Sequence, residues 1–223
     1  MKKIVLLLGI IALITVNNSV FSQKAFEGTI IYGIEYEDLP EEMEAMKAML
    51  PSETMIKIKG SKTRTEQSTG MGSTISIHDR KDNLSITLMD MMGSKVAIKM
   101  NSEDEKNTKK EAEVLDIKYL DETKEIAGYK CKKAEITIEG EEEAIIIFYT
   151  EEINTEETKS QYKGLKGFPM LYEINTPEMK MVMTVKEVKK GKVSSAEFTI
   201  PAEYEEMTME EFQTKMSGSM MGE

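Results

Sequence analysis

The stretch that decides the fold is Phe26-Glu27-Gly28-Thr29-Ile30-Ile31-Tyr32-Gly33-Ile34-Glu35-Tyr36. Every second residue from Phe26 onward is apolar or glycine, and Glu27, Thr29 and Glu35 fall between them. A period of two places one set of side chains on each face of an extended strand. The stretch therefore predicts a long strand with one buried face.

The same alternation recurs along the chain, and short turn sequences such as Lys81-Asp82-Asn83 and Gly93-Ser94 separate the segments. The further predicted strands cover residues 54–60, 62–68, 73–79, 84–90, 95–100, 114–119, 129–139, 143–150, 170–175, 179–188 and 192–200. Turns of this kind connect antiparallel neighbours. We predict a mainly β fold, a curved antiparallel sheet in the form of a half-barrel with two short helices.

The first predicted helix covers residues 39–50, with Asp38 as N-cap and Pro40 in the first turn. The second covers residues 208–216, where Thr208 and Glu211 form a capping box. Their apolar residues recur at helical spacing: Met43, Met46, Met49 and Leu50 in the first, and Met209, Phe212 and Met216 in the second. We expect both helices to cover the concave face of the sheet.

Residues 144–149, Ala-Ile-Ile-Ile-Phe-Tyr, are apolar at every position. Such a strand is expected to be covered on both faces, so we predict it as the central strand. Together with the alternating stripe that begins at Met179, it supplies the candidate residues for an apolar ligand: Ile146, Phe148, Met179, Met181, Met183 and Val185. Residues 101–112 are strongly charged and fit an exposed linker or hairpin tip, or equally a solvated helix.

The N-terminus has the layout of a cleaved export signal, with Lys2-Lys3, an apolar run over residues 4–16, and small residues up to Ser22. That run is shorter than the roughly 20 residues that span a bilayer. No Cys lies near the predicted cleavage site, so a lipid-attached Cys is not expected. We predict a signal peptide over residues 1–22, a single domain over 23–216, and a disordered tail over 217–223. The exported protein is expected to be periplasmic or secreted and not membrane-spanning.

Composition argues against several function classes. With 40 acidic and 29 basic residues the formal charge is −11, which disfavours binding to nucleic acid phosphates. The single Cys131 cannot form an internal disulfide, and we expect it to be buried rather than reactive. The single His78 cannot build a multi-histidine metal site, and no nucleophile elbow, zinc-protease pair or phosphate loop is present. We therefore expect neither an enzyme nor a bound cofactor.

Methionine is abundant, with 19 residues. Flexible thioethers fill irregular cores, and they could also line a cavity for an acyl chain. A third reading is Cu(I) binding, because sulfur is a preferred ligand of that soft ion. The clusters that would serve it are Met89, Met91 and Met92, and Met207, Met209, Met216, Met220 and Met221. Neither cluster has a His or Cys beside it.

Four short segments carry a resemblance to a known family: residues 26–30, 127–134, 166–170 and 198–204. They resemble an uncharacterised secreted family whose layout is similar to that of the LolA and LolB lipoprotein-carrier proteins. Residues 167–174, Gly-Phe-Pro-Met-Leu-Tyr-Glu-Ile, also resemble the motif of the GLPGLI group. The resemblance implies a curved antiparallel half-barrel with helices near its open face, and it brings no catalytic residue.

These observations predict an exported, non-enzymatic binding protein with an apolar cavity for lipid or acyl chains, or for a lipidated protein. The main alternative is a structural or interaction module of the cell envelope. In that case the sheet would be fully packed, and the acidic surface would contact another envelope protein. Cu(I) binding through methionine is the remaining alternative.

Overall fold

The computed structural model describes residues 25–37, 39–91, 93–100, 115–138, 144–155, 162, 164–175 and 179–220. The predicted signal peptide, the charged segment 101–112 and residues 221–223 lie outside this description. The strands are β1 (Glu27–Glu37), β2 (Glu53–Lys59), β3 (Lys62–Thr69), β4 (Gly72–Asp79), β5 (Leu84–Met91), β6 (Ser94–Met100), β7 (Leu115–Ile126), β8 (Tyr129–Ile138), β9 (Ile145–Thr150), β10 (Phe168–Asn175), β11 (Lys180–Lys190) and β12 (Glu205–Met207). The helical segments are α1 (Glu41–Glu44), the 3₁₀ turns η1 (Lys47–Met49) and η2 (Ser195–Phe198), and α4 (Met209–Met220).

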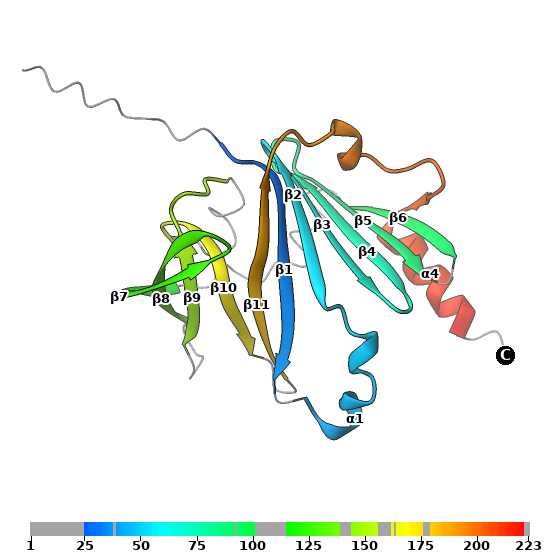
Figure 1. The fold of residues 1–223 in the computed structure, drawn as a ribbon. Coiled ribbons are helices and arrows are strands. Elements are labelled where there is room, and N and C mark those ends of the chain that lie inside the picture. Colours follow the sequence, from blue (N-terminus) through cyan, green and yellow to red (C-terminus); the bar gives the residue numbers. More distant parts are fainter. Residues whose placement is uncertain are drawn as a thin grey trace, which may run out of the picture.

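All twelve strands belong to one sheet, in the order β12-β6-β5-β4-β3-β2-β1-β11-β10-β9-β8-β7 (Figure 1). Neighbouring strands run antiparallel except β12, which pairs parallel to β6. The mainly β, antiparallel prediction is confirmed. The half-barrel curvature of the lipoprotein carriers stays a prediction.

The middle of the sheet is formed by β2 and β1, whose pairing joins Ile58 to Gly28, and β11 follows on the other side of β1. The prediction that residues 144–149 form the central strand is wrong, because β9 lies third from the β7 edge. The face of β9 that carries Phe148 is covered by nearby side chains instead. Phe148 is only 8% exposed, and the ammonium of Lys124 lies 5.8 Å from its ring centroid.

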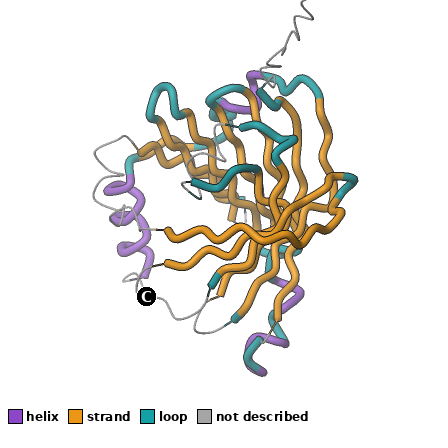
Figure 2. Tube along the Cα trace, turned by 90° about the vertical axis from the view of Figure 1, so that its left-hand side faces the viewer, coloured by secondary structure: helices purple, strands orange, loops and turns teal. Residues whose placement is uncertain are grey.

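The predicted helix over residues 39–50 is also wrong in extent. Only α1, with Pro40 as N-cap, and η1 form there, and the predicted N-cap Asp38 lies outside the described residues. Figure 2 shows both segments projecting beyond the strand ends rather than covering the sheet. Met46 and Met49 are consequently 50% and 47% exposed.

The second helix begins as predicted, since the backbone N–H of Glu211 donates to Thr208 Oγ1 at 3.2 Å and Glu211 accepts from the Thr208 N–H. It continues past the predicted end at Met216 to Met220, so the helix is longer than predicted. Met209 and Phe212 pack against Val96 and Ile98 of β6. This helix covers the β6 edge of the sheet and not its middle.

Residues 192–200 form no strand, contrary to prediction. Val193 and Phe198 turn inward and pack against Ile77, Ile86 and Leu88. The carbonyl of Val193 accepts a 2.7 Å hydrogen bond from Lys59 Nζ, and Ser194 caps η2. A side chain on the sheet thus satisfies a backbone group that a neighbouring strand would otherwise satisfy. The chain then adds β12 at the β6 edge, a strand that the alternation did not reveal.

The register defines two faces. The front face carries Tyr32 and its paired neighbour Thr54, and the back face carries Lys57 with Arg64 opposite it. The segment with η2 packs on the back face of β4 to β6 through Ile77 and Ile86. The largest buried cluster contains Ile30, Ile136 and Met170 and spans β1, β8 and β10.

Candidate functional site

A pocket of about 430 Å³ opens on the front face, across β10, β11, β1, β2 and β3. We call it the front pocket. Its lining residues are Tyr32, Ile34, Tyr36, Pro51, Thr54, Ile56, Thr63, Thr65, Gln67, Phe168, Tyr172, Ile174, Met181 and Met183. Its volume falls in the range of small-molecule sites.

The apolar wall of the front pocket follows from the register of β1, β11 and β10. Ile34 stands opposite Met183, and Tyr36 stands opposite Met181, across the β1–β11 ladder. On the next strand, Ile174 pairs with Met181. Residues two apart on each strand share a face, so these side chains form one continuous apolar surface.

Two tyrosines of this wall have their hydroxyls tied to the backbone. Tyr32 donates to the carbonyl of Pro169 at 2.6 Å, and Tyr36 donates to the carbonyl of Pro51 at 2.8 Å. The Tyr32 ring meets the Tyr172 ring edge-to-face, with centroids 5.8 Å apart. Burial raises the pKa of Tyr36, so its hydroxyl stays neutral. With their hydroxyls engaged, these tyrosines contribute mainly ring surface to the pocket.

The polar wall comes from β2 and β3. Thr54 and Thr63 are almost fully buried, while Thr65 and Gln67 are half-buried. Gln67 Nε2 donates to Thr54 Oγ1 at 2.9 Å. Hydroxyl and amide groups both donate and accept hydrogen bonds. This wall can therefore pair with a neutral polar group of a ligand.

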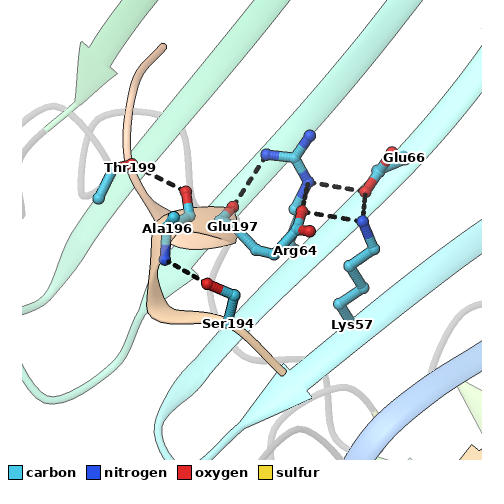
Figure 3. A network of polar contacts seen from close by, with 7 residues as sticks. All are labelled: Lys57, Arg64, Glu66, Ser194, Ala196, Glu197 and Thr199. Atoms are coloured by element: carbon cyan, nitrogen blue, oxygen red, sulfur yellow. Dashed lines mark hydrogen bonds and ion pairs between the residues drawn. The ribbon is translucent and has the colours of Figure 1, made fainter. Parts of the chain in front are cut away.

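Three charged side chains of β2 and β3, Lys57, Arg64 and Glu66, lie on the back face, where they contact each other and Glu197 of η2 (Figure 3). Lys57 Nζ lies 2.8 Å from Glu66 Oε1 and 2.9 Å from Glu197 Oε2. Arg64 Nε lies 2.7 Å from Glu66, and its Nη1 donates to the carbonyl of Glu197 at 2.9 Å. Burial alone would raise the pKa of Glu66, but hydrogen bonds from Lys57 and Arg64 outweigh burial and lower it.

The other strands of the front pocket follow the same rule. Lys180 Nζ lies 3.2 Å from Glu37 Oε2 and 3.2 Å from Glu173 Oε2. Lys186 Nζ lies 3.4 Å from Glu35 Oε1. Each of these residues is one position away from a pocket-lining residue or from a residue of the same apolar stripe, so its side chain points to the back face. The polypeptide thus separates charge from the pocket across the thickness of one sheet.

The predicted ligand residues divide into two groups. Met181 and Met183 line the front pocket, and Val185, 2% exposed, continues their stripe into the core. Met179 is half-buried and precedes β11. Ile146 and Phe148 do not line it. Phe148 pairs with Lys133 and Leu171, while the neighbouring Ile147 shares a face with Tyr172 of the pocket.

Sequence reasoning missed most of the lining, including Tyr32 and Tyr36 from the opening strand and Thr65 and Gln67 from β3. A signal for β3 was present. Thr63, Thr65 and Gln67 alternate with Lys62, Arg64 and Glu66, so one face is polar but uncharged.

Only some of the clustered methionines pack in the core. Met89, Met207 and Met209, the first residue of α4, pack with Val96 and Ile98, whereas Met91 is 54% exposed. Met92 and Met221 lie outside the described residues. Within the described part of the chain, no group of three or more His, Cys, Asp and Glu side chains could hold a metal ion.

The two isolated reactive residues lie apart from the front pocket lining. Cys131 is buried, its thiol donates to the Tyr129 carbonyl at 3.4 Å, and burial raises its pKa to about 11. His78 is exposed on β4, and its Nδ1 lies 2.9 Å from Ser85 Oγ. A second pocket, of about 440 Å³, lies near Phe26 and mixes Glu27 and Glu152 with Lys190 and Lys192.

Comparison with known proteins leaves the family open. No family model matches the chain, so the resemblance to the GLPGLI group has no support there, and no curated protein matches either. Two crystal forms of PNGF-II are similar to 87% of this chain, with 16% and 17% identity and TM-scores of 0.49 and 0.48. LprF from Mycobacterium bovis is similar to 80% of it and is itself covered to 90%, with 11% identity and a TM-score of 0.35.

The chain spans about a third of the length of PNGF-II, namely 34% and 33% in the two forms. Similarity at this level identifies no family. None of the helices in the described ranges is long and apolar enough to cross a membrane.

Proposed function

We propose that this chain is a non-enzymatic binding protein that holds an acyl chain of a lipid, or of a lipidated protein, in the front pocket. The observation that supports the proposal is the pairing of a Tyr, Ile and Met wall with a wall of Thr and Gln in one pocket of about 430 Å³. Such a pocket offers apolar contact along one side and hydrogen bonds along the other.

We also propose that the protein acts outside the cytoplasm, after removal of residues 1–22. A lipid carrier in that compartment has an aqueous gap to bridge, and the pocket would shield the chain from water there. Purification from the periplasm or culture medium, followed by N-terminal sequencing, tests this point. A chain that begins at Gln23 is expected, and a cytoplasmic chain that retains Met1 would contradict it.

Dye displacement tests the binding function. The exported chain, stripped of bound lipid, should enhance the fluorescence of N-phenylnaphthylamine and release the dye when lauroyl glycerol is added. Thr65→Trp places a large ring in the front pocket and should abolish the enhancement. Ser68→Trp is the matched control, because Ser68 is exposed on the back face of the same strand and its variant should bind normally.

A flat dye signal in the unmodified protein would refute the binding function. The protein would then be better explained as a structural or interaction module of the envelope. Equal loss of signal in Thr65→Trp and Ser68→Trp, with both variants folded, would place dye binding outside the front pocket.

A further inference from the structure

We infer that the ligand of the front pocket is an uncharged amphiphile, an acyl chain joined to a neutral hydroxyl-bearing group as in a glycerol ester, and neither a free fatty acid nor a cationic lipid. This inference rests on the proposed function and specifies its ligand class. Charged residues make up 31% of the chain, yet the described residues that line the front pocket include no Asp, Glu, Lys, Arg or His.

The absence of charge is built into the alternation of the strands. In β3, Arg64 and Glu66 are interleaved with Thr63, Thr65 and Gln67, and the two sets point to opposite faces. In β2, Lys57 likewise lies between Ile56 and Ile58. A one-residue shift of register would bring these charges into the pocket.

The back-face cations are also held in place by partners. Lys57 contacts both Glu66 and Glu197, and Arg64 contacts Glu66 and the Glu197 carbonyl. The side chains of Lys57 and Arg64 are only 19% and 11% exposed, so neither can reach the front pocket from the back face. Among the described residues, none would therefore offer a counter-charge to a ligand carboxylate buried in the front pocket, and such burial is strongly unfavourable.

A neutral head group meets a better environment. Gln67 uses one N–H for Thr54, and an amide has a second N–H and a carbonyl oxygen. Thr65, half-buried in the same wall, supplies a hydroxyl. These groups can match the hydroxyls of a glycerol ester, while the chain lies against Met181 and Ile174.

His78 is a titratable group that lies next to the front pocket on the same face. His78 on β4 is paired with Thr63, and its ring contacts Ser85. Within the pocket, the hydroxyls of Tyr32 and Tyr36 donate to backbone carbonyls. Ligand titrations of the His78→Gln variant show whether charge on the imidazole contributes to the choice of ligand.

The experiment compares three ligands with the same hydrocarbon length on the lipid-stripped exported chain: lauroyl glycerol, laurate and dodecylammonium. Each is titrated below its critical micelle concentration at about pH 8. Lauroyl glycerol should bind at least about 10-fold more tightly than either ion, because burying a single uncompensated charge lowers the affinity by more than that factor. Equal or tighter binding of either ion, in the parent or in His78→Gln, overturns the inference while leaving the binding function intact. Failure of all three ligands and the dye overturns both.

A second arm reverses the preference. Gln67→Lys adds a cation to the polar wall and should raise affinity for laurate relative to lauroyl glycerol by about 10-fold. Ser68→Lys adds the same charge to the back face and should leave the ratio unchanged. An equal change in both variants would show that overall charge, and not the neutral wall, sets the ligand class, and would overturn the inference.

Discussion

The hydroxyl of Tyr32 on β1 donates a 2.6 Å hydrogen bond to the carbonyl of Pro169 on β10, although β11 lies between these two strands. The two residues are 137 positions apart in the chain. The bond fixes the Tyr32 ring against Phe168 and Tyr172, at centroid distances of 6.3 and 5.8 Å. It thereby shapes the apolar wall of the front pocket.

Tyr32→Phe should destabilise the fold by about 1–3 kcal/mol, because the Pro169 carbonyl loses its partner in a buried site. Urea unfolding followed by circular dichroism measures the change. Tyr36→Phe is the matched control, since Tyr36 is only half-buried and water can replace its hydroxyl. A smaller loss in Tyr32→Phe than in Tyr36→Phe would contradict the assigned role.

Met183 and Met181 lie two residues apart and should respond differently to truncation. Met183 is 6% exposed, so Met183→Ala should cost about 2–5 kcal/mol of stability, as core truncations do. Met181 is half-buried on the open side of the pocket, and Met181→Ala should cost less than about 1 kcal/mol while weakening ligand binding. Thermal melts and dye titration separate the two effects. A large stability loss in Met181→Ala would indicate a filled core in place of a pocket.

Glu197 holds the η2 segment against the sheet through Lys57 and Arg64. Glu197→Gln should destabilise the protein by about 1–3 kcal/mol and expose residues 192–204 to proteolysis, because two mostly buried cations lose a partner. Glu203→Gln serves as the control. Glu203 Oε1 lies 3.6 Å from Lys95 Nζ in a solvent-exposed ion pair. Such pairs contribute about 0–1 kcal/mol to stability. Equal proteolysis of the two variants would show that packing of Phe198 alone retains the segment.

Cys131 should be inert in the folded protein. Burial raises its pKa from 9.0 to about 11, so the folded state retains the proton at a pH where the unfolded chain has lost it. The resulting stabilisation is fully present below about pH 9 and is lost as the pH rises toward about 11. Iodoacetamide labelling at about pH 8 should require unfolding, because only the thiolate reacts. Rapid labelling of native protein would contradict this. In Cys131→Ala, the corresponding part of the alkaline stability loss should disappear.

Several features could be predicted from the sequence because their causes are local. Alternation fixed the buried face of β1, and short polar turns fixed the hairpins from β2 to β6, which pair in chain order. The Thr208–Glu211 capping box gave the start of α4. Each of these depends on residues within a few positions of one another.

The tertiary structure decided the rest. The apolar composition of residues 144–149 fits a central strand and a strand near an edge equally well. The pairing of β1 with β11, two segments far apart in the chain, places β9 away from the middle of the sheet. Residues 192–200 alternate like a strand but pack as a turn, since Lys59 binds the Val193 carbonyl and Glu197 meets Lys57 and Arg64. The sequence alone determined which side chains share a strand face. Which strands lie side by side and so line the front pocket was decided by long-range pairing, because period-two alternation carries no information about a strand's neighbours.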